Sequence, residues 1–131
     1  MNRGKSMRNL IVLLVLWSGV AWGQQGEWSY SGRTGDGDSA FVQLENIQKA
    51  GPYVRTWTKL TDSTGACTIS YCEFDLKRQR MRELKTMEYD AHGNILNNGT
   101  GDNTWTVYPP GSFVHRWMEM ISLQVNKIGH E

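Results

Sequence analysis

Residues 53–60 and 68–76 constrain the fold of this chain more than any other feature. Both segments are rich in β-branched and aromatic residues, which favour the extended backbone of a strand. The five residues Thr61-Asp62-Ser63-Thr64-Gly65 between the two segments are turn-forming. The sequence therefore predicts two strands joined by a short turn.

Shorter segments of the same kind lie on both sides of this pair. Further strands are predicted at residues 27–31, 40–44, 77–90, from 95 onward and 105–108. Met81, Leu84 and Met87 recur every three residues, as in a helix, whereas Met81, Met87 and Tyr89 share the parity of a strand face. The preceding strands and the turn at residues 92–94 favour the strand. Residues 45–50 predict a turn or a single helical turn, and residues 97–102 predict an exposed loop.

The C-terminal segment has the pattern of an amphipathic helix. Pro109-Pro110-Gly111 ends the sheet, and Ser112 is placed to cap a helix by accepting from a free backbone N–H. The apolar stripe of this helix consists of Phe113, Val114, Trp117, Met118, Met120 and Ile121. We expect fraying from Asn126. The predicted fold class is α+β: an antiparallel sheet of about five to six strands with one C-terminal helix packed on it.

The N-terminus has the three parts of a secretory signal. Arg3, Lys5 and Arg8 precede an apolar run, and Ala21-Trp22-Gly23 ends in the small-x-small pattern of a cleavage site. The apolar run spans residues 10–22 at most, which is shorter than the ~20 residues that cross a bilayer. We therefore expect a signal peptide at 1–23 and one domain at 24–131, without a membrane span. An uncleaved N-terminal anchor is the alternative.

Cleavage after Gly23 would change the charge of the chain. The whole chain has 14 basic and 13 acidic residues, and residues 1–23 hold three of the basic and none of the acidic ones. The remaining 108 residues carry 11 basic against 13 acidic residues, a net charge of −2. This balance argues against nucleic-acid binding by an exported protein. The expected location is the periplasm, the cell surface or the extracellular space of a bacterium.

Cys67 and Cys72 lie in one predicted strand. Their odd spacing puts the side chains on opposite faces, and five steps of ~3.3 Å separate the backbones by about 16 Å. A disulfide needs Cα atoms within ~7 Å. No disulfide is therefore predicted between them; intermolecular pairing is the minor alternative.

The sequence offers little that indicates catalysis. His92, His115 and His130 have no zinc-site spacing, and neither a nucleophile elbow nor a phosphate-binding Gly-Lys-Ser loop is present. Residues 36–39 resemble the start of a calcium loop but lack its downstream glutamate. We therefore expect a non-enzymatic protein with no metal and no cofactor. A small hydrolase or enzyme inhibitor, with residues assembled only by the fold, is a third reading.

One cluster of basic residues stands out as a candidate binding site. It holds five of the 11 basic residues outside the signal segment: Lys77, Arg78, Arg80, Arg82 and Lys85. In a strand, Arg78, Arg80 and Arg82 would form a row on one face. Such a row could bind an acidic protein segment or a sulfated glycan. The competing interpretation is a solvated sheet face balanced by Glu73, Asp75 and Glu83.

A series of short motifs runs through residues 27–122: Asp36-Gly37-Asp38, Ile47-Gln48-Lys49-Ala50-Gly51, Val54-Arg55-Thr56-Trp57, Glu73-Phe74-Asp75 with its basic run, Tyr89 to Gly93-Asn94, and Trp105 leading to Pro109-Pro110-Gly111-Ser112. The order of these motifs resembles the surface-adhesin protein E family of small exported bacterial domains. The resemblance implies an antiparallel sheet with a C-terminal helix. It also favours a strand at residues 77–90.

The resemblance implies adhesion to host matrix and serum proteins such as laminin, vitronectin and plasminogen. Relatives often carry a sheet-to-helix disulfide, but this chain has Leu76 and Ile121-Ser122 at those positions, so that crosslink is not expected. The first functional expectation is an exported binding module whose ligand is a protein or an anionic glycan. A periplasmic accessory domain that recognises an envelope protein is the alternative. An exposed strand edge also allows a homodimer.

Overall fold

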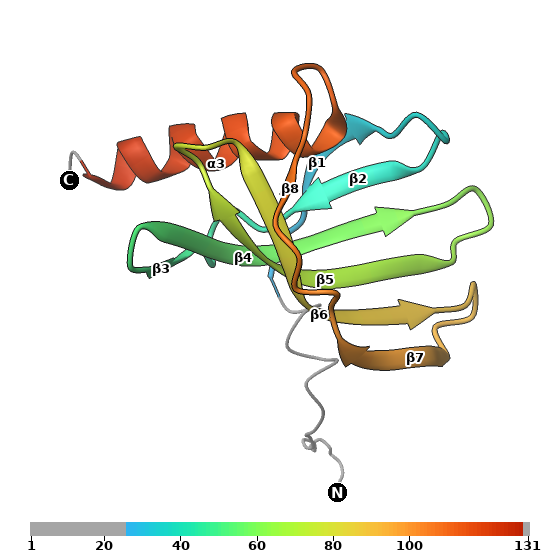
Figure 1. The fold of residues 1–131 in the computed structure, drawn as a ribbon. Coiled ribbons are helices and arrows are strands. Elements are labelled where there is room, and N and C mark those ends of the chain that lie inside the picture. The colour runs from blue at the N-terminus through green and yellow to red at the C-terminus, as the bar shows by residue number, and fades with distance from the viewer. Residues whose placement is uncertain (1–25, 130–131) are drawn as a thin grey trace, which may run out of the picture.

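The computed structural model describes residues 26–129, which form an open antiparallel sheet with one C-terminal helix packed against it (Figure 1). The strands are β1 (Ser29–Arg33), β2 (Ser39–Val42), β3 (Gln48–Ala50), β4 (Tyr53–Thr61), β5 (Cys67–Asp75), β6 (Arg80–Tyr89), β7 (Ile95–Thr100) and β8 (Thr106–Val107), and the helix is α3 (Phe113–Gly129). The predicted α+β fold class is confirmed. The predicted signal segment 1–23 and His130 lie outside the described residues.

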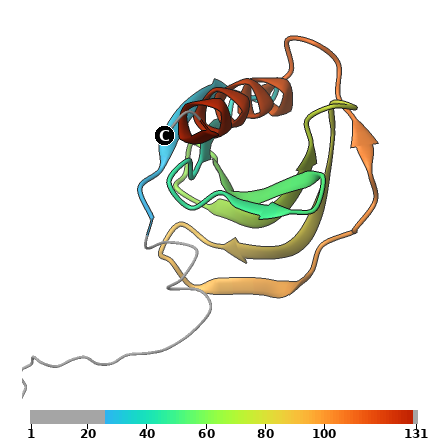
Figure 2. The ribbon, with the colours of Figure 1, turned by 90° about the vertical axis from the view of Figure 1, so that its left-hand side faces the viewer.

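The sheet has a simple neighbour order with two short additions. Its strands follow the order β1-β2-β4-β5-β6-β7, while β3 pairs with β4 and β8 pairs with β6. Between β7 and β8, the N–H of Gly101 donates to the carbonyl of Leu84 and that of Asn103 to the carbonyl of Glu83. Residues 95–107 thus follow β6 along most of its length. The sheet curls so that α3 lies on its inner side (Figure 2).

The predicted long strands are confirmed as β4, β5 and β6, but β6 begins at Arg80 rather than at residue 77. Residues 76–79 form the turn between β5 and β6 instead. Gln79 occupies the left-handed backbone region at φ 55°, and its side chain donates to the carbonyl of Leu76 at 2.6 Å. Lys77 and Arg78 therefore lie in this turn, and the prediction that they belong to the strand is wrong.

Two further expectations are wrong. Residues 48–50, predicted as a turn or helical turn, form β3, which pairs with β4 across the turn at Gly51. Residues 97–100, predicted as a loop, continue β7, whose six residues are all exposed. Neither segment has alternating apolar residues. Each is held in the sheet by backbone pairing with a longer neighbouring strand and not by burial of its side chains.

The predicted helix is confirmed, and it is longer than expected. The Oγ of Ser112 accepts from the N–H of His115 at 3.2 Å, which is the predicted cap. The helix continues to Gly129, so the expected fraying from Asn126 is wrong. Val125 packs against the core and Lys127 lies in the last turn, where a cation complements the helix dipole.

The two faces of the sheet bury different clusters. On the inner face, which is the face toward α3, buried residues of the sheet and the helix form the main core: Ala40, Val42, Val54, Cys72, Phe74, Met81, Val114, Trp117, Met118 and Ile121. Leu76 packs on this core, as its position without a partner cysteine predicts. On the outer face, Ile69, Met87 and Tyr89 form a smaller cluster with Trp28, Trp57 and Cys67 around it.

The two cysteines lie on opposite faces of β5, as their spacing predicts. Cys72 is fully buried in the main core and Cys67 is half-buried in the outer cluster. Both are free thiols. Within residues 26–129 no helix combines the length and apolarity needed to cross a membrane.

Candidate binding face

The structure separates the five predicted site residues into three groups. Arg80 and Arg82 lie on β6 with their side chains on the outer face. Lys77 and Arg78 lie in the turn that precedes β6, and Lys85 lies further along β6. The predicted row of three arginines on one strand is therefore a pair on the strand and a third in the turn.

Two buried carboxylates of β5 organise these arginines. In the register of the β5–β6 hairpin, Asp75 lies opposite Arg80 and Glu73 opposite Arg82. The Nε of Arg80 lies 2.9 Å from Oδ2 of Asp75, and the Nη2 of Arg82 lies 2.6 Å from Oε1 of Glu73. Both carboxylates are almost inaccessible to water, at 1% and 3% exposure for Glu73 and Asp75. Cross-strand pairing thus brings the charges together.

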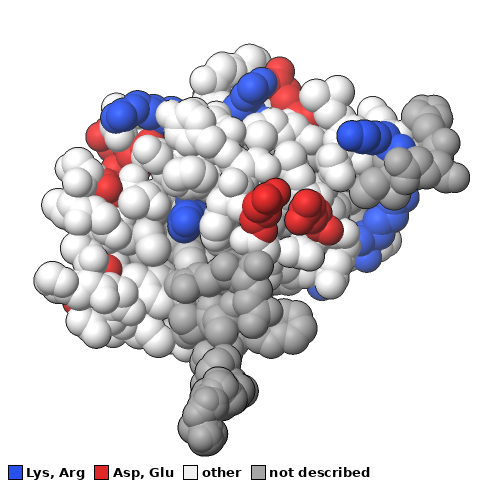
Figure 3. Space-filling view, turned by 180° about the vertical axis from the view of Figure 1, so that it is seen from behind, with Lys and Arg blue, Asp and Glu red and all other residues white. Residues whose placement is uncertain are grey.

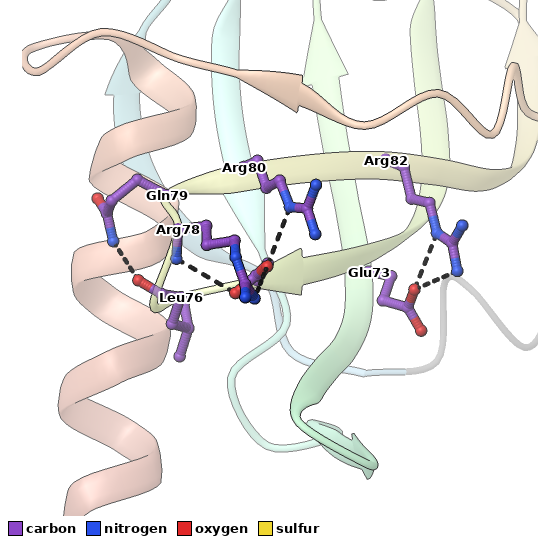
Figure 4. Close-up of polar contacts among 7 residues, drawn as sticks. Glu73, Leu76, Arg78, Gln79, Arg80 and Arg82 are labelled. Atoms are coloured by element: carbon purple, nitrogen blue, oxygen red, sulfur yellow. Dashed lines mark hydrogen bonds and ion pairs between the residues drawn. The ribbon is translucent and has the colours of Figure 1, made fainter.

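Each carboxylate also has a second guanidinium. Arg55, which lies opposite Glu73 on β4, donates from Nε to Oε2 of Glu73 at 2.7 Å. Arg78 reaches Asp75 from the turn, through its backbone N–H at 3.2 Å and its guanidinium at 3.4 Å. Figure 4 shows Arg78 and Arg80 meeting on one carboxylate and Arg82 on Glu73. Charged hydrogen bonds of this kind are the stronger ones in proteins.

The contacts of Asp75 favour its ionised form. Burial raises the pKa of Asp75, but the hydrogen bonds from Arg80 and Arg78 outweigh that effect, so its pKa lies below the ordinary value. Four guanidiniums surround two carboxylates, which leaves two positive charges in excess. Arg80 and Arg82 remain 26% exposed and Arg55 39%. The carboxylates are thus buried in the sheet, while the guanidiniums that they bind stay partly exposed to solvent.

Trp105, directly before β8, packs against Arg80 and Arg82 and leaves them partly exposed. Its ring centre lies 4.5 Å from the guanidinium carbon of Arg80 and 4.6 Å from that of Arg82. Tyr53 of β4 packs on the same indole, with 5.0 Å between ring centres. Arginine stacked on tryptophan is the favoured cation–π pair. We call the surface formed by Tyr53, Arg55, Arg80, Arg82 and Trp105 the arginine face.

Glu83 does not balance the arginine face. Its parity on β6 is opposite to that of Arg82, so its side chain lies on the inner face, opposite Cys72. There it accepts a hydrogen bond from the hydroxyl of Ser70 at 3.1 Å. The interpretation of a balanced sheet face therefore holds for Glu73 and Asp75 and fails for Glu83.

A hollow of about 550 Å³ also opens on the outer face. Trp57 and Tyr71, whose rings pack 5.0 Å apart, form part of its wall, and amide and glutamate side chains complete it: Glu27, Gln43, Glu45, Asn46 and Gln48. Burial raises the pKa of Tyr71 while the nearby charge of Arg55 lowers it, so the hollow adjoins the arginine face. Sequence reasoning gave no sign of this hollow, because its walls come from four separate segments.

The remaining polar candidates do not form a site. His92 is exposed in the turn after β6, and His115 is half-buried in the first turn of α3. Among the described residues no group of three metal-ligating side chains converges. Seen from the side opposite to Figure 1, neutral atoms dominate the surface and charged side chains are scattered (Figure 3).

No family model, no curated protein and no solved structure matches this chain.

Proposed function

We propose that this protein is a non-enzymatic binding module that recognises an acidic segment of a partner protein through the arginine face. One observation carries the proposal: two buried carboxylates hold four guanidiniums in fixed positions beside a tryptophan. The residue types are those that dominate the binding energy of protein interfaces, namely Trp, Tyr and Arg. Binding to such a surface costs little side-chain conformational entropy, because ion pairs and the Trp105 ring already fix the arginine side chains.

The charge of this surface suits an acidic ligand. The four guanidiniums paired with Glu73 and Asp75, that of Arg78 included, leave two positive charges in excess on a chain whose predicted exported part has a net charge of −2. Lys77 and Lys85 lie at the margins of the arginine face and are exposed, and they add to the local field. An acidic partner would be attracted to this region and repelled by much of the remaining surface.

The proposed cellular role rests on the predicted export signal and on the family resemblance. The proposed role is a surface adhesin of the protein E type, with a host matrix or serum protein as the partner. A periplasmic domain that binds another envelope protein uses the same face in a different location. Protease treatment of intact cells distinguishes these roles, since only a surface protein is degraded.

The binding test reverses charge at the margin of the arginine face; it removes the Arg78–Asp75 pair but keeps the Arg80 pair of Asp75 and both arginines of Glu73. We expect the triple variant Lys77→Glu, Arg78→Glu, Lys85→Glu to fold, because Arg78 is 62% exposed and the two lysines are exposed. Binding of the purified protein to laminin, vitronectin and plasminogen is measured at physiological salt. The variant should bind at least about 10-fold more weakly, mainly through slower association.

A matched control carries the same kind of change on the helix. Arg116→Glu with Lys127→Glu reverses exposed charges on α3, and it should leave binding unchanged. Equal loss in both variants would show that net charge alone attracts the ligand. Binding to heparin but to none of the proteins would contradict the proposed protein partner.

A further inference from the structure

A second site lies on the opposite side of the sheet from the arginine face. A cavity of about 110 Å³ separates the inner faces of β4, β5 and β6 from the first turns of α3. Its polar lining consists of Thr58, Thr68, Ser70, Glu83, Tyr108 and Trp117. Its apolar lining consists of Leu60, Met81, Phe113 and Val114. Leu60, Thr68 and Tyr108 are partly exposed, so the cavity lies close to solvent.

One wall of this cavity has an unused donor. Trp117 is 2% exposed, and its indole Nε1 has no hydrogen-bond partner within the described part of the chain. A buried N–H without a partner is unfavourable because it has lost its hydrogen bonds to water, so native proteins rarely leave one unmatched. The edge-on packing of Phe113 against the indole fixes the ring in place. The geometry thus calls for an acceptor atom next to Trp117.

Glu83, on another wall of the cavity, needs a donor and not an acceptor. Its Oε2 accepts from the hydroxyl of Ser70 at 3.1 Å, and no cationic side chain within residues 26–127 forms an ion pair with it. Its backbone is held by the hydrogen bond from Asn103. Burial raises the pKa of Tyr108 and the charge of Glu83 raises it further, so the phenol stays protonated beside the carboxylate. A carboxylate without a cation favours a positively charged donor.

We propose that this cavity binds a small protonated primary amine that also carries an oxygen acceptor, a short amino alcohol being the simplest member of the class. The ammonium group donates to Glu83, and the oxygen accepts from the indole N–H of Trp117. The methylene groups between them pack on the apolar lining. A cavity of ~150 Å³ accommodates benzene, so about 110 Å³ accommodates a molecule of this size.

Ethanolamine is the probe, and the indole N–H resonance of Trp117 is the readout. The resonance is assigned with Trp117→Phe, which removes the N–H and keeps an aromatic ring in the core. We expect the Trp117 signal to shift downfield on titration, while the other indole signals stay in place. For so small a ligand the expected dissociation constant is about 1 mM.

The matched variant is Glu83→Gln, which keeps the shape of the side chain and its acceptor for Ser70. It should weaken ethanolamine binding about 10-fold or more while leaving the free spectrum native. n-Propylamine lacks the acceptor oxygen and should bind more weakly. Ethylene glycol lacks the ammonium group and should also bind more weakly.

The outcomes separate this proposal from the arginine face. An unmoved Trp117 signal at saturating ethanolamine, or equal shifts with Glu83→Gln, would overturn the proposal and leave a cavity that holds only water. The triple variant of Lys77, Arg78 and Lys85 serves as a second control, because none of these residues lines the cavity. Equal ethanolamine binding by this variant and the unchanged protein is expected.

Discussion

The two faces of the β5–β6 hairpin treat their carboxylates in opposite ways: Glu73 and Asp75 are buried on the outer face, and Glu83 is half-buried on the inner face. On the outer face, Glu73 and Asp75 each lie against two guanidiniums. On the inner face, Glu83 accepts a hydrogen bond from the neutral hydroxyl of Ser70 and has no cationic partner among the described residues. All three carboxylates lie within one pair of strands. They differ because the side chains of Glu73 and Asp75 point to the outer face and that of Glu83 points to the inner face.

This difference indicates which carboxylates maintain the fold and which is left for a ligand. Removing one partner from a buried ion pair leaves an uncompensated charge, so Glu73 and Asp75 are bound to their arginines for stability. Glu83 forms no ion pair among the described residues, so the fold does not depend on its charge. The outer face thus uses carboxylates to position arginines for an external partner, and the inner face leaves a carboxylate to meet a cation.

The largest expected contrast between the faces concerns the two thiols. Cys72 is fully buried on the inner face, and burial raises its pKa to about 12; Cys67 is half-buried on the outer face, where burial also raises its pKa but to a smaller extent. Because the thiolate is the reactive form and Cys67 is the more accessible thiol, Cys67 should be alkylated about 10³-fold faster in the folded protein. The rates are measured by mass spectrometry at mildly alkaline pH. Both thiols should react equally in denaturant, and equal rates in the native protein would contradict the assignment of faces.

A smaller effect is expected from shortening an arginine of the outer network. Arg82→Ala leaves Glu73 with Arg55 as its remaining cation and removes one wall of the Trp105 stack. The free energy of unfolding should fall by about 2 kcal/mol, as determined by urea titration. Arg116→Ala is the matched control, because the Arg116–Glu119 pair on α3 is exposed and is worth less than about 0.5 kcal/mol.

Loss of the tryptophan cover should cost less than loss of Arg82. Trp105→Ala removes the ring that stacks on Arg80 and Arg82 and packs on Tyr53, while both ion pairs remain. Unfolding by urea should show a loss of about 1 kcal/mol. Binding of the protein partner should weaken as well, and unchanged binding would remove Trp105 from the proposed interface.

The smallest effect is the pH dependence contributed by Asp75. Its pKa is lowered in the folded protein, so its stabilisation is complete above the ordinary pKa of 3.8 and is lost as the pH falls toward the lowered value. The stability difference between the unchanged protein and Asp75→Asn should be constant from pH 7 to about 5 and shrink below about pH 4. Urea titrations at several pH values measure it. A difference that grows on acidification would contradict the ion pairing.

Much of this fold is readable from the sequence because burial leaves a pattern. The burial of β4 alternates along the strand, and the helix stripe from Phe113 to Ile121 recurs with the helical period. β5 is buried on both faces over its last four residues and is readable from its residue types instead. β3 and β7 are not readable in this way, since a polar or fully exposed strand is held by its neighbour's backbone. The end of α3 is set by packing of Val125, which is a tertiary contact.

The candidate site was only partly accessible from the sequence. The basic run contains Arg80 and Arg82 of the arginine face, but the turn at residues 76–79 decides which arginine faces which carboxylate. The stacking of Trp105 on Arg80 needs the return of the chain along β6, which no local pattern encodes. The inner cavity joins Glu83 to Trp117 across the sheet–helix interface and has no sequence signal.

The unfolding free energies of Glu73→Gln and Glu83→Gln test the contrast between the faces most directly. The substitution is identical, and the two positions lie on neighbouring cross-strand pairs of one hairpin. Glu73→Gln should cost about 2–3 kcal/mol, because it leaves Arg55 and Arg82 without their anion, and Glu83→Gln should change stability by less than about 0.5 kcal/mol. Equal losses at both positions, or a larger loss for Glu83→Gln, would contradict the account.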